Sequence, residues 1–345
     1  MTRTVAIVGA TGAVGRELRR LLAERDLPAD EIRLVASERS AGTELTVRGE
    51  QVTVRALSDP DVFEGVDLAL FSAGGGRSKE YAPQAVDAGA LVVDNSSAWR
   101  LDPQVPLVVT EVNAGVLDQR PPRGIVANPN CTTMVAMLPL KALHDAFGLT
   151  GFTATSFQAA GGAGQKGIDE LMTQARELID DPELLRSDGA AAAKRVSHEV
   201  HAAPLAFNVV PKMGEVDERG YTDEEMKLQN ESRKILGIAD LPVTPTCVRV
   251  PVVVGHAIQV RATFSREVTA SAALEVLEAF PNLLTDELPT PLEWAGRSET
   301  VVGRVRDDLV DPQALNLWVT GDNLLKGAAL NTLQIAEELI ARGHA

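Results

Sequence analysis

The chain has 345 residues, 45% of them hydrophobic and 23% charged, which is ordinary for a globular protein but too long for a single hydrophobic core. The formal net charge of −15 argues against nucleic acid or an anionic membrane as a partner of the surface as a whole. The chain opens in a strand-like run without a signal-peptide pattern, and no apolar run is long enough to span a membrane. Its two cysteines, Cys131 and Cys247, form no disulfide framework, which fits a reducing compartment, so we expect a cytoplasmic location. From the length we expect two domains.

The first predicted element is a strand over residues 5–8. It is followed by the glycine turn G-A-T-G-A-V-G (residues 9–15) and by a predicted helix over residues 16–23. In this arrangement the glycines let a pyrophosphate approach the backbone, and the helix N-terminus supplies N–H donors. The spacing G-x-x-G-x-x-G is a variant of the dinucleotide fingerprint, so we predict a nucleotide site, with a purely structural turn as the alternative.

The second predicted strand, residues 32–36, leads into the segment S-E-R-S-A-G (residues 37–42). An NAD-binding protein usually carries an acidic residue here for the ribose 2′-hydroxyl, and Glu38 could serve. Arg39 with Ser37 and Ser40 could instead bind a 2′-phosphate, because a guanidinium offers a forked set of charged donors. We therefore predict NADP as the cofactor. Because of Glu38, NAD is the alternative.

Further strands are predicted over residues 66–72, 90–94, 106–109 and 124–127. Strands that alternate with helical segments are typical of a doubly wound parallel sheet in an α/β domain. Ligands of such sheets bind at the carboxyl ends of the strands. Four side chains that could carry chemistry fall at these ends: Ser72, Asn95, Arg100 and Cys131.

Cys131 follows the turn N-P-N (residues 128–130) and precedes an apolar run at helical spacing over residues 134–143. At the start of a helix, unpaired N–H groups and the helix dipole favour a thiolate over a thiol. A thiolate is a good nucleophile for covalent catalysis. The alternative is simple packing, because cysteine is among the most buried residue types.

After this helix the regular alternation of strands and helices ends. A strand is predicted over residues 151–159, with Gln158 near its end, followed by glycine-rich residues 161–164 and a helix over 168–179. The alanine-rich residues 189–194 are predicted to form a helical or irregular surface insertion. His198 and His201 lack a third ligand, so we predict no metal site.

A helix is predicted over residues 223–236, with Thr222 as its N-cap. Glu224 and Lys227 share one face of this helix, where a plain surface ion pair is the alternative to a binding role. The strand-like residues 243–254 contain Arg249 among apolar side chains, and a buried arginine there predicts a carboxylate-binding role.

His256 follows a glycine before the predicted strand 258–264. It is a natural proton-transfer partner for a cysteine nucleophile, and a structural role is the alternative. Near the end of the chain we predict a strand at residues 318–319. An amphipathic helix over residues 325–341 is expected to pack back on the nucleotide domain.

These segments together resemble aspartate-β-semialdehyde dehydrogenases over nearly the whole chain. Motifs that occur in order are far more specific than any one of them. They are G-A-T-G-A-V-G, S-E-R-S-A-G, D-N-S-S-A-W-R, N-P-N-C-T-T, Q-A-A-G-G-A-G, E-E-M-K, R-V-P-V-V-V-G-H and D-N-L-L-K-G-A-A. The resemblance implies a Rossmann-type NADP-binding domain over residues 1–130, completed by the helix 323–345. An α+β catalytic and dimerisation domain would span residues 131–322 and form a homodimer, with a homotetramer as the alternative.

The resemblance also implies roles for particular residues. Cys131 would be the acyl-thioester nucleophile, His256 the general acid and base, and Gln158 the residue that orients the thioester. Substrate groups would be bound by Arg249 (carboxylate), Glu224 (amino group), Arg100 and Lys227 (phosphate), with Asn130 nearby. Cofactor contacts would come from Thr11, Gly12, Ala13 and Val14 (pyrophosphate), Arg39 and Ser40 (2′-phosphate), Gly161 and Gly162 (nicotinamide side), and Asn323.

The implied reaction is the NADPH-dependent reduction of L-aspartyl 4-phosphate to L-aspartate 4-semialdehyde, in lysine, threonine, methionine and diaminopimelate biosynthesis. Its partners would be the semialdehyde, the acyl phosphate and inorganic phosphate. Two positions depart from the common pattern, since Gly161 stands where serine is frequent and Trp99 where phenylalanine is frequent. The rival readings are N-acetylglutamyl-phosphate reductase or glyceraldehyde-3-phosphate dehydrogenase, which lack the E-E-M-K helix, and a non-catalytic paralogue.

Overall fold

The computed structural model describes residues 3–345, which form two compact units. The first unit contains the chain up to Met137 together with Asn230–Ala239 and Leu324–Ala345, and the second contains Leu138–Gln229 and Asp240–Asn323. Helices α4 (Cys131–Phe147) and α8 (Asp223–Leu236) therefore begin in one unit and end in the other. The predicted domain boundaries at residues 130 and 323 stay a prediction. One difference is that residues 230–239 group with the first unit, where Lys234 Nζ donates to the carbonyl oxygens of Arg100, Asp102 and Val105 at 2.7–2.8 Å.

The first unit is built on a six-stranded, fully parallel sheet in the order β5-β2-β1-β6-β7-β8. Its strands are β1 (Thr4–Val8), β2 (Glu31–Ala36), β5 (Arg55–Ala56), β6 (Leu68–Phe71), β7 (Leu91–Asp94) and β8 (Ile125–Ala127). This is the Rossmann order, in which the chain changes direction between β1 and β6 and leaves a ligand crevice at their carboxyl ends. The predicted doubly wound parallel sheet is confirmed.

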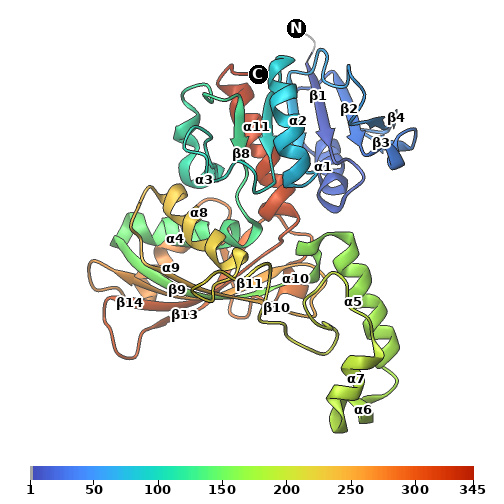
Figure 1. The fold of residues 1–345 in the computed structure, drawn as a ribbon. Coiled ribbons are helices and arrows are strands. Elements are labelled where there is room, and N and C mark those ends of the chain that lie inside the picture. Colours follow the sequence, from blue (N-terminus) through green and yellow to red (C-terminus); the bar gives the residue numbers. More distant parts are fainter. Residues whose placement is uncertain (1–2) are drawn as a thin grey trace. The chain divides into compact units, whose positions relative to one another are not determined.

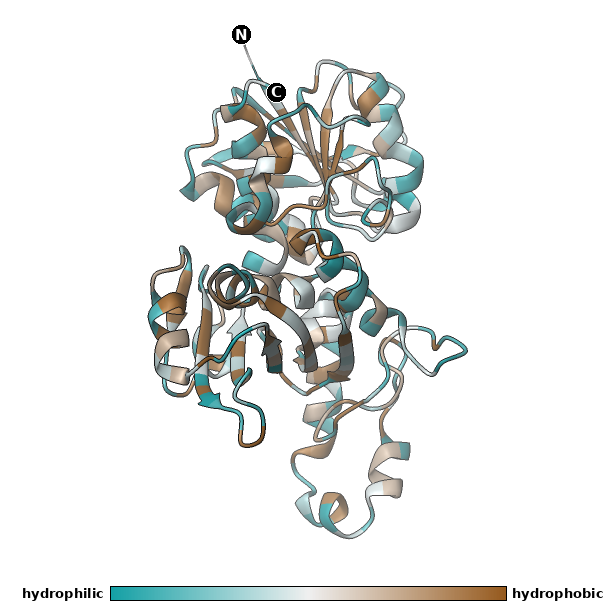
Figure 2. Ribbon diagram, turned by 90° about the vertical axis from the view of Figure 1, so that its left-hand side faces the viewer, coloured by the Kyte–Doolittle hydropathy of each residue, from teal (hydrophilic) through white to brown (hydrophobic). Residues whose placement is uncertain are grey.

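Helices cover this sheet because each presents one apolar face. Helix α1 (Ala13–Glu24) buries Leu18, Leu21 and Leu22 against the sheet side chains of Val5 and Ile7. Helix α2 (Gly75–Asp87) packs against β6 and β7 (Figure 1). In Figure 2 the parallel strands carry hydrophobic colours, and hydrophilic colours lie on the helices around them. Short helices α3 (Thr110–Asn113), η1 (Glu38–Ser40) and η2 (Ala114–Leu117) complete the connections.

Two local predictions in this unit need correction. The strand expected over residues 106–109 is wrong, because only Leu107 forms an isolated bridge, to Ala127, before the chain turns into α3. Pro106 has no N–H group with which to extend a ladder. A hairpin of β3 (Glu44–Val47) and β4 (Glu50–Thr53) was not predicted, although Leu45, Val47 and Val52 alternate with polar residues and pack on the core of this unit.

The C-terminal residues pack as predicted on the nucleotide-binding unit. A π-helical turn, η4 (Leu325–Ala329), leads into α11 (Leu330–Ala341), and Leu333 and Leu339 join the same core as Val5 and Ile7. Lys326 is fully buried and donates to Glu111 (2.5 Å) and Gln334 (2.6 Å), and burial lowers the pKa of its ammonium to about 8. Within residues 3–345 no helix has the length and apolar character needed to cross a membrane.

The second unit is built on a mixed six-stranded sheet in the order β10-β9-β11-β14-β13-β12. Its strands are β9 (Leu149–Gln158), β10 (Val243–Arg249), β11 (His256–Phe264), β12 (Leu283–Thr285), β13 (Thr300–Asp307) and β14 (Ala314–Gly321). β9 runs parallel to β10 and antiparallel to β11. The ends of β9 and β10 and the start of β11 therefore meet at one edge. This α+β architecture confirms the predicted fold class.

The helices of the second unit include one projecting group. α5 (Gln165–Leu178), α6 (Pro182–Ser187) and α7 (Gly189–Arg195) extend away from the sheet as an arm (Figure 1). The remaining short helices are α9 (Ala270–Glu278), α10 (Pro291–Trp294) and η3 (Ala160–Ala163). At the start of α8, Glu225 N donates to Thr222 Oγ1 (3.3 Å) and Thr222 N to Glu225 Oε2 (2.7 Å), which is a capping box and confirms the predicted N-cap.

Candidate active site

The predicted pyrophosphate turn lies at the switch point of the parallel sheet. Gly9 has a φ of 92°, and a Cβ atom there would collide with the carbonyl oxygen of Ser72. A Cβ at Gly15 would in turn collide with the carbonyl oxygen of Gly9. Gly12 caps α1 without a side chain and is exposed together with Thr11, while Ala13 and Val14 open the helix half-buried. The turn thus leaves bare backbone N–H groups at a helix N-terminus, which fits a dinucleotide pyrophosphate.

The ribose end of this site carries charges of both signs. Arg39 and Ser40 form the 3₁₀ turn η1 directly after β2. Glu38 precedes them, and a hydrogen bond from Ser58, supported by the charge of Arg77, lowers the pKa of its carboxyl. The guanidinium of Arg39 is exposed.

Cys131 is the first residue of α4, as predicted. Asn130 caps this helix, because its Oδ1 accepts hydrogen bonds from the backbone N–H groups of Thr132 (2.9 Å) and Thr133 (3.3 Å). The Cys131 thiol is half-buried, whereas Cys247 is buried, and desolvation raises the pKa of the Cys247 thiol to about 12. The chain therefore has one thiol suited to nucleophilic chemistry.

Arg100 lies in the same unit as Cys131, buried beside the turn that precedes it. Its Nε donates to Asn128 O (2.9 Å), its Nη2 to Asn95 O (2.6 Å), and its Nη1 pairs with Glu231 Oε1 at 3.1 Å. Sequence reasoning found Arg100 through the D-N-S-S-A-W-R motif but gave no sign of Glu231. The guanidinium therefore holds the turn before Cys131, and its contact with phosphate stays a prediction.

In the second unit, three predicted residues meet at one edge of the mixed sheet. Gln158 ends β9, Arg249 ends β10 directly opposite it, and His256 begins β11. The peptide groups of Ala159 link two of them, since Ala159 N donates to His256 Nδ1 (3.1 Å) and Arg249 Nη1 donates to Ala159 O (2.7 Å).

The contact with Ala159 fixes the tautomer of His256. A backbone N–H can only donate, so Nδ1 must be the acceptor and Nε2 must carry the proton. Burial, and then the positive charge of Arg249, lower the pKa of His256 to about 3, against a smaller opposing effect of Glu224. His256 is therefore neutral at pH 7 and presents Nε2–H as a hydrogen-bond donor.

The glycine loop after β9 lies against these side chains. A Cβ at Gly162 would lie 2.8 Å from Arg249 Nη1 and 3.4 Å from His256 Cε1. A Cβ at Gly161 would lie 2.8 Å from Val253 O, so serine, the common residue at this position, could not fit here without a backbone shift. Asn323 also reaches this edge, where its Oδ1 accepts from Gly255 N (2.9 Å). Its buried Nδ2 has no hydrogen-bond partner within residues 3–345.

The Gly162 contact yields a first prediction. We expect Gly162→Ala to lower kcat/KM about tenfold or more, because the new methyl group displaces the Arg249 guanidinium from its place beside His256. Steady-state kinetics of the purified variant measures this. Gly189→Ala is the matched control, since a Cβ at Gly189 meets no atom within 4 Å. Equal activity of the two variants would contradict the prediction.

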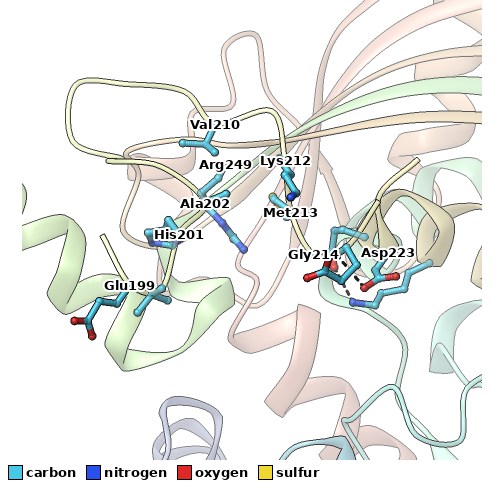
Figure 3. Close-up of a pocket in the computed structure, with 13 residues that line it drawn as sticks. Glu199, His201, Ala202, Val210, Lys212, Met213, Gly214, Asp223 and Arg249 are labelled. Atoms are coloured by element: carbon cyan, nitrogen blue, oxygen red, sulfur yellow. Dashed lines mark hydrogen bonds and ion pairs between the residues drawn. The ribbon is translucent and has the colours of Figure 1, made fainter. Parts of the chain in front are cut away.

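A cavity of about 410 Å³ opens beside Arg249 in the second unit. Arg249, Lys212 and Lys227 supply its positive charges. Its acidic lining residues are Glu199, Glu215, Asp223 and Glu224. In Figure 3 Arg249 lies between the segment with His201 and Ala202 and the segment with Lys212 and Met213. Glu224 and Lys227 form an ion pair at 3.0 Å, so the predicted shared helix face is confirmed.

Lys212 and His201 line this cavity but were not among the predicted site residues. Lys212 lies in an irregular segment with no periodic pattern, so only the structure reveals it. His201 donates from Nε2 towards Gly167 O at 3.3 Å, and burial lowers its pKa. Within residues 3–345 no group of three or more His, Cys, Asp or Glu residues could hold a metal ion.

The structure thus groups the predicted residues into two sets. The first unit contains Arg39, Ser40, Arg100, Asn130, Cys131 and the turn Thr11 to Val14. The second contains Gln158, Gly161, Gly162, Glu224, Lys227, Arg249, His256 and Asn323. Their roles in binding and catalysis stay predictions.

Comparison with known families identifies the class of protein. Residues 4–120 match the family model of the semialdehyde dehydrogenase NAD-binding domain, and residues 140–326 match that of the semialdehyde dehydrogenase dimerisation domain. Fold and site together define a semialdehyde dehydrogenase with a nicotinamide-dinucleotide-binding domain.

Individual relatives show which family within this class the chain resembles. The chain is 49% identical to the aspartate-semialdehyde dehydrogenases of Streptomyces akiyoshiensis (98% of each chain covered) and Corynebacterium glutamicum (98% of this chain, 99% of the other). It superimposes on the Vibrio cholerae aspartate semialdehyde dehydrogenase II complexed with ASA with a TM-score of 0.92, at 39% identity and 99% coverage of both chains. The chain belongs to the aspartate-semialdehyde dehydrogenase family. The reaction of this family is the NADP-dependent reductive dephosphorylation of aspartyl phosphate in amino-acid biosynthesis, and the resemblance drawn from the sequence is confirmed.

Proposed function

We propose that this chain carries out the reaction of its family with Cys131 as the nucleophile and NADPH as the reductant. The observation that carries the proposal is the set of charges that lines the cavity of the second unit. L-Aspartyl 4-phosphate carries a carboxylate, an ammonium and a phosphate. We assign Arg249 to the carboxylate and Glu224 to the ammonium. Arg100 and Lys227 would bind the phosphate, with Asn130 capping the helix of the nucleophile.

The proposed steps follow from these groups. The Cys131 thiolate attacks the acyl-phosphate carbon, and inorganic phosphate leaves as the C–S bond forms. Bound NADPH supplies the hydride that reduces this thioester. The resulting thiohemiacetal releases the semialdehyde and returns the thiolate. Gln158, at the end of β9, would orient the thioester.

His256 would act at the oxygen of the reacting carbonyl. The oxygen gains negative charge in both tetrahedral species, and the neutral Nε2–H can donate a hydrogen bond to it. The Ala159 N–H group blocks protonation of Nδ1, so the imidazole acts from its neutral form. A neutral histidine with a lowered pKa is an established electrophilic group in other enzymes.

For the cofactor, we propose NADP rather than NAD. Arg39 and Ser40 would bind the 2′-phosphate, Thr11 to Val14 the pyrophosphate, and Gly161, Gly162 and Asn323 the nicotinamide side. Support comes from the exposed Arg39 guanidinium directly after β2, and from the unsatisfied Asn323 Nδ2. A cytoplasmic location remains part of this proposal.

We further propose a homodimer formed through the open face of the mixed sheet, with a tetramer as the larger alternative. Phe157 and Trp318 stack on this face with ring centroids 5.3 Å apart, and both stay half-buried in the single chain. Trp318→Glu should shift the protein towards monomers, because the dimer would bury a charge. Light scattering coupled to gel filtration measures this. Leu292→Glu, at a side chain 87% exposed outside the sheet, is the control, and an unchanged mass for Trp318→Glu would refute the assigned face.

The decisive experiment is nicotinamide reduction with aspartate semialdehyde, with and without inorganic phosphate. We expect phosphate-dependent turnover with NADP and weaker turnover with NAD. N-acetylglutamate semialdehyde serves as the competing substrate, and turnover of that aldehyde alone would reject the proposal. NADP binding without turnover of either aldehyde would favour a non-catalytic paralogue.

A further inference from the structure

One buried carboxylate in the first unit has no part in the proposed reaction. Glu231 lies in the second half of α8, and its side chain is only 2% exposed. Its Oε2 accepts a hydrogen bond from the backbone N–H of Asn130 at 2.6 Å, and its Oε1 pairs with Arg100 Nη1 at 3.1 Å. The Glu231 carboxylate thus binds both the Asn130 backbone and the Arg100 guanidinium, next to the turn of residues 128–130 that precedes Cys131.

The partners of Glu231 surround this turn. Asn130 is the residue before Cys131 and the N-cap of α4, so holding its backbone N–H limits the position of the next residue. Arg100 reaches the carbonyl oxygens of Asn128 and Asn95 with its other nitrogens. The Glu231 carboxylate and the Arg100 guanidinium, which are paired with each other, thus hold the backbone of the turn at Asn128 and Asn130.

The part of α8 that carries Glu231 is held in place by a neighbouring lysine. Lys234, one turn after Glu231, donates to the carbonyl oxygens of Arg100 (2.8 Å), Asp102 (2.7 Å) and Val105 (2.8 Å). These three bonds hold the backbone that carries Arg100 against the helix that carries Glu231. The Glu231 side chain is therefore carried by a helix segment that is itself held in place.

From this geometry we infer that Glu231 is a positioning residue for Cys131. The inference rests on the proposed nucleophilic role of Cys131. Stability alone gives a buried ion pair little advantage over apolar packing, because desolvation of the two charges offsets their attraction. A carboxylate suits this place because both of its partners are donors and each is bound by a different oxygen, Oε1 by Arg100 and Oε2 by Asn130.

The test compares Glu231→Gln with the wild-type enzyme. Glutamine offers one acceptor oxygen and one NH₂ group, so it satisfies Asn130 or Arg100 but not both. We expect kcat to fall about 10- to 100-fold, because the thiolate is displaced from the carbonyl carbon. KM for aspartate semialdehyde should change by no more than about threefold, because Arg249 and Glu224 are untouched. KM for phosphate should rise, because Glu231 also holds Arg100, which is assigned to the phosphate. Glu231→Asp keeps the charge but is one methylene shorter, and should give an intermediate loss.

A second readout separates position from ionisation. The rate of Cys131 alkylation by iodoacetamide, followed by peptide mass spectrometry across pH, reports the thiolate population. Its midpoint should not rise in Glu231→Gln, since losing a nearby negative charge does not disfavour a thiolate. The control is Glu337→Gln, which breaks the Arg25–Glu337 pair (2.7 Å) of the same unit and should leave kcat and the midpoint unchanged.

The outcomes are distinct. A folded Glu231→Gln protein with kcat within about twofold of wild type would overturn the inference, and Glu231→Asp with wild-type kcat would do so if the glutamine variant fails to fold. A raised alkylation midpoint that accounts for the lost kcat would assign Glu231 to ionisation instead of position. Failure of the proposed function would show separately, in the wild-type protein. That protein would have no phosphate-dependent turnover, and iodoacetamide would not alkylate Cys131 in preference to Cys247.

Discussion

Replacing Cys131 with serine should reduce phosphate-dependent turnover by at least about three orders of magnitude. The capped helix N-terminus favours a thiolate at this position, whereas a serine hydroxyl has a much higher pKa than a thiol and stays protonated there. Nucleotide binding should persist, because the glycine turn after β1 is untouched. Steady-state assays and NADP titration of the same preparation measure both quantities.

Cys247→Ala is the matched control for this substitution. Its thiol is buried and its pKa is raised to about 12, so it cannot supply the nucleophile. We expect lower thermal stability from the small cavity, with turnover within about threefold of wild type. If Cys131→Ser keeps more than about a tenth of the activity, the covalent mechanism is wrong.

His256 substitutions should have the second-largest effect, a loss of about 10²- to 10⁴-fold in kcat for His256→Ala. If the imidazole acts as a neutral donor through Nε2–H, His256→Gln should recover about tenfold over alanine, because its amide N–H can reach a similar point. Equal activities of the two variants would show that a proton must pass through the ring. Pre-steady-state kinetics of both variants distinguishes these outcomes.

The lowered pKa of His256 also predicts how stability depends on pH. The unfolded chain binds a proton near pH 6.5, whereas the folded protein binds it only near pH 3. The unfolded state therefore holds more protons between these values, and the free energy of unfolding falls as the solution is acidified through this window. His256→Gln should remove a slope of about 1.4 kcal/mol per pH unit there. Urea titrations between pH 4 and about pH 7 would detect its absence, and an unchanged slope would contradict a neutral buried histidine.

Much of the nucleotide unit could be predicted because its signals are local. The apolar run of β1, the glycine turn and the leucines of α1 lie within 24 residues and each determines its own conformation. The start of α4 at Cys131 was equally accessible, since Asn130 caps the helix from the adjacent position. Local propensity and packing agree at these sites.

The remaining features depend on residues far apart in the chain. Glu231 binds Asn130 across 101 positions, and Ala159 fixes the His256 tautomer across 97. Nothing near Glu231 marks it as different from the other charges of α8, because periodicity reports burial and not the identity of a partner. The strand prediction for residues 106–109 was wrong although its signal was local. The segment is apolar, but it forms a single isolated bridge to β8 instead of a ladder of hydrogen bonds.

The packing of α11 has a consequence for biosynthesis. Leu333 and Leu339 complete the core that β1 begins with Val5 and Ile7, so this core stays open on the ribosome until the C-terminal helix has emerged. Every segment of the mixed-sheet unit has been translated by Asn323. We therefore expect the first unit to complete its core only after the second unit has been translated, which departs from the usual N-to-C order of nascent domains. During most of translation the apolar face of the parallel sheet is therefore accessible to chaperones.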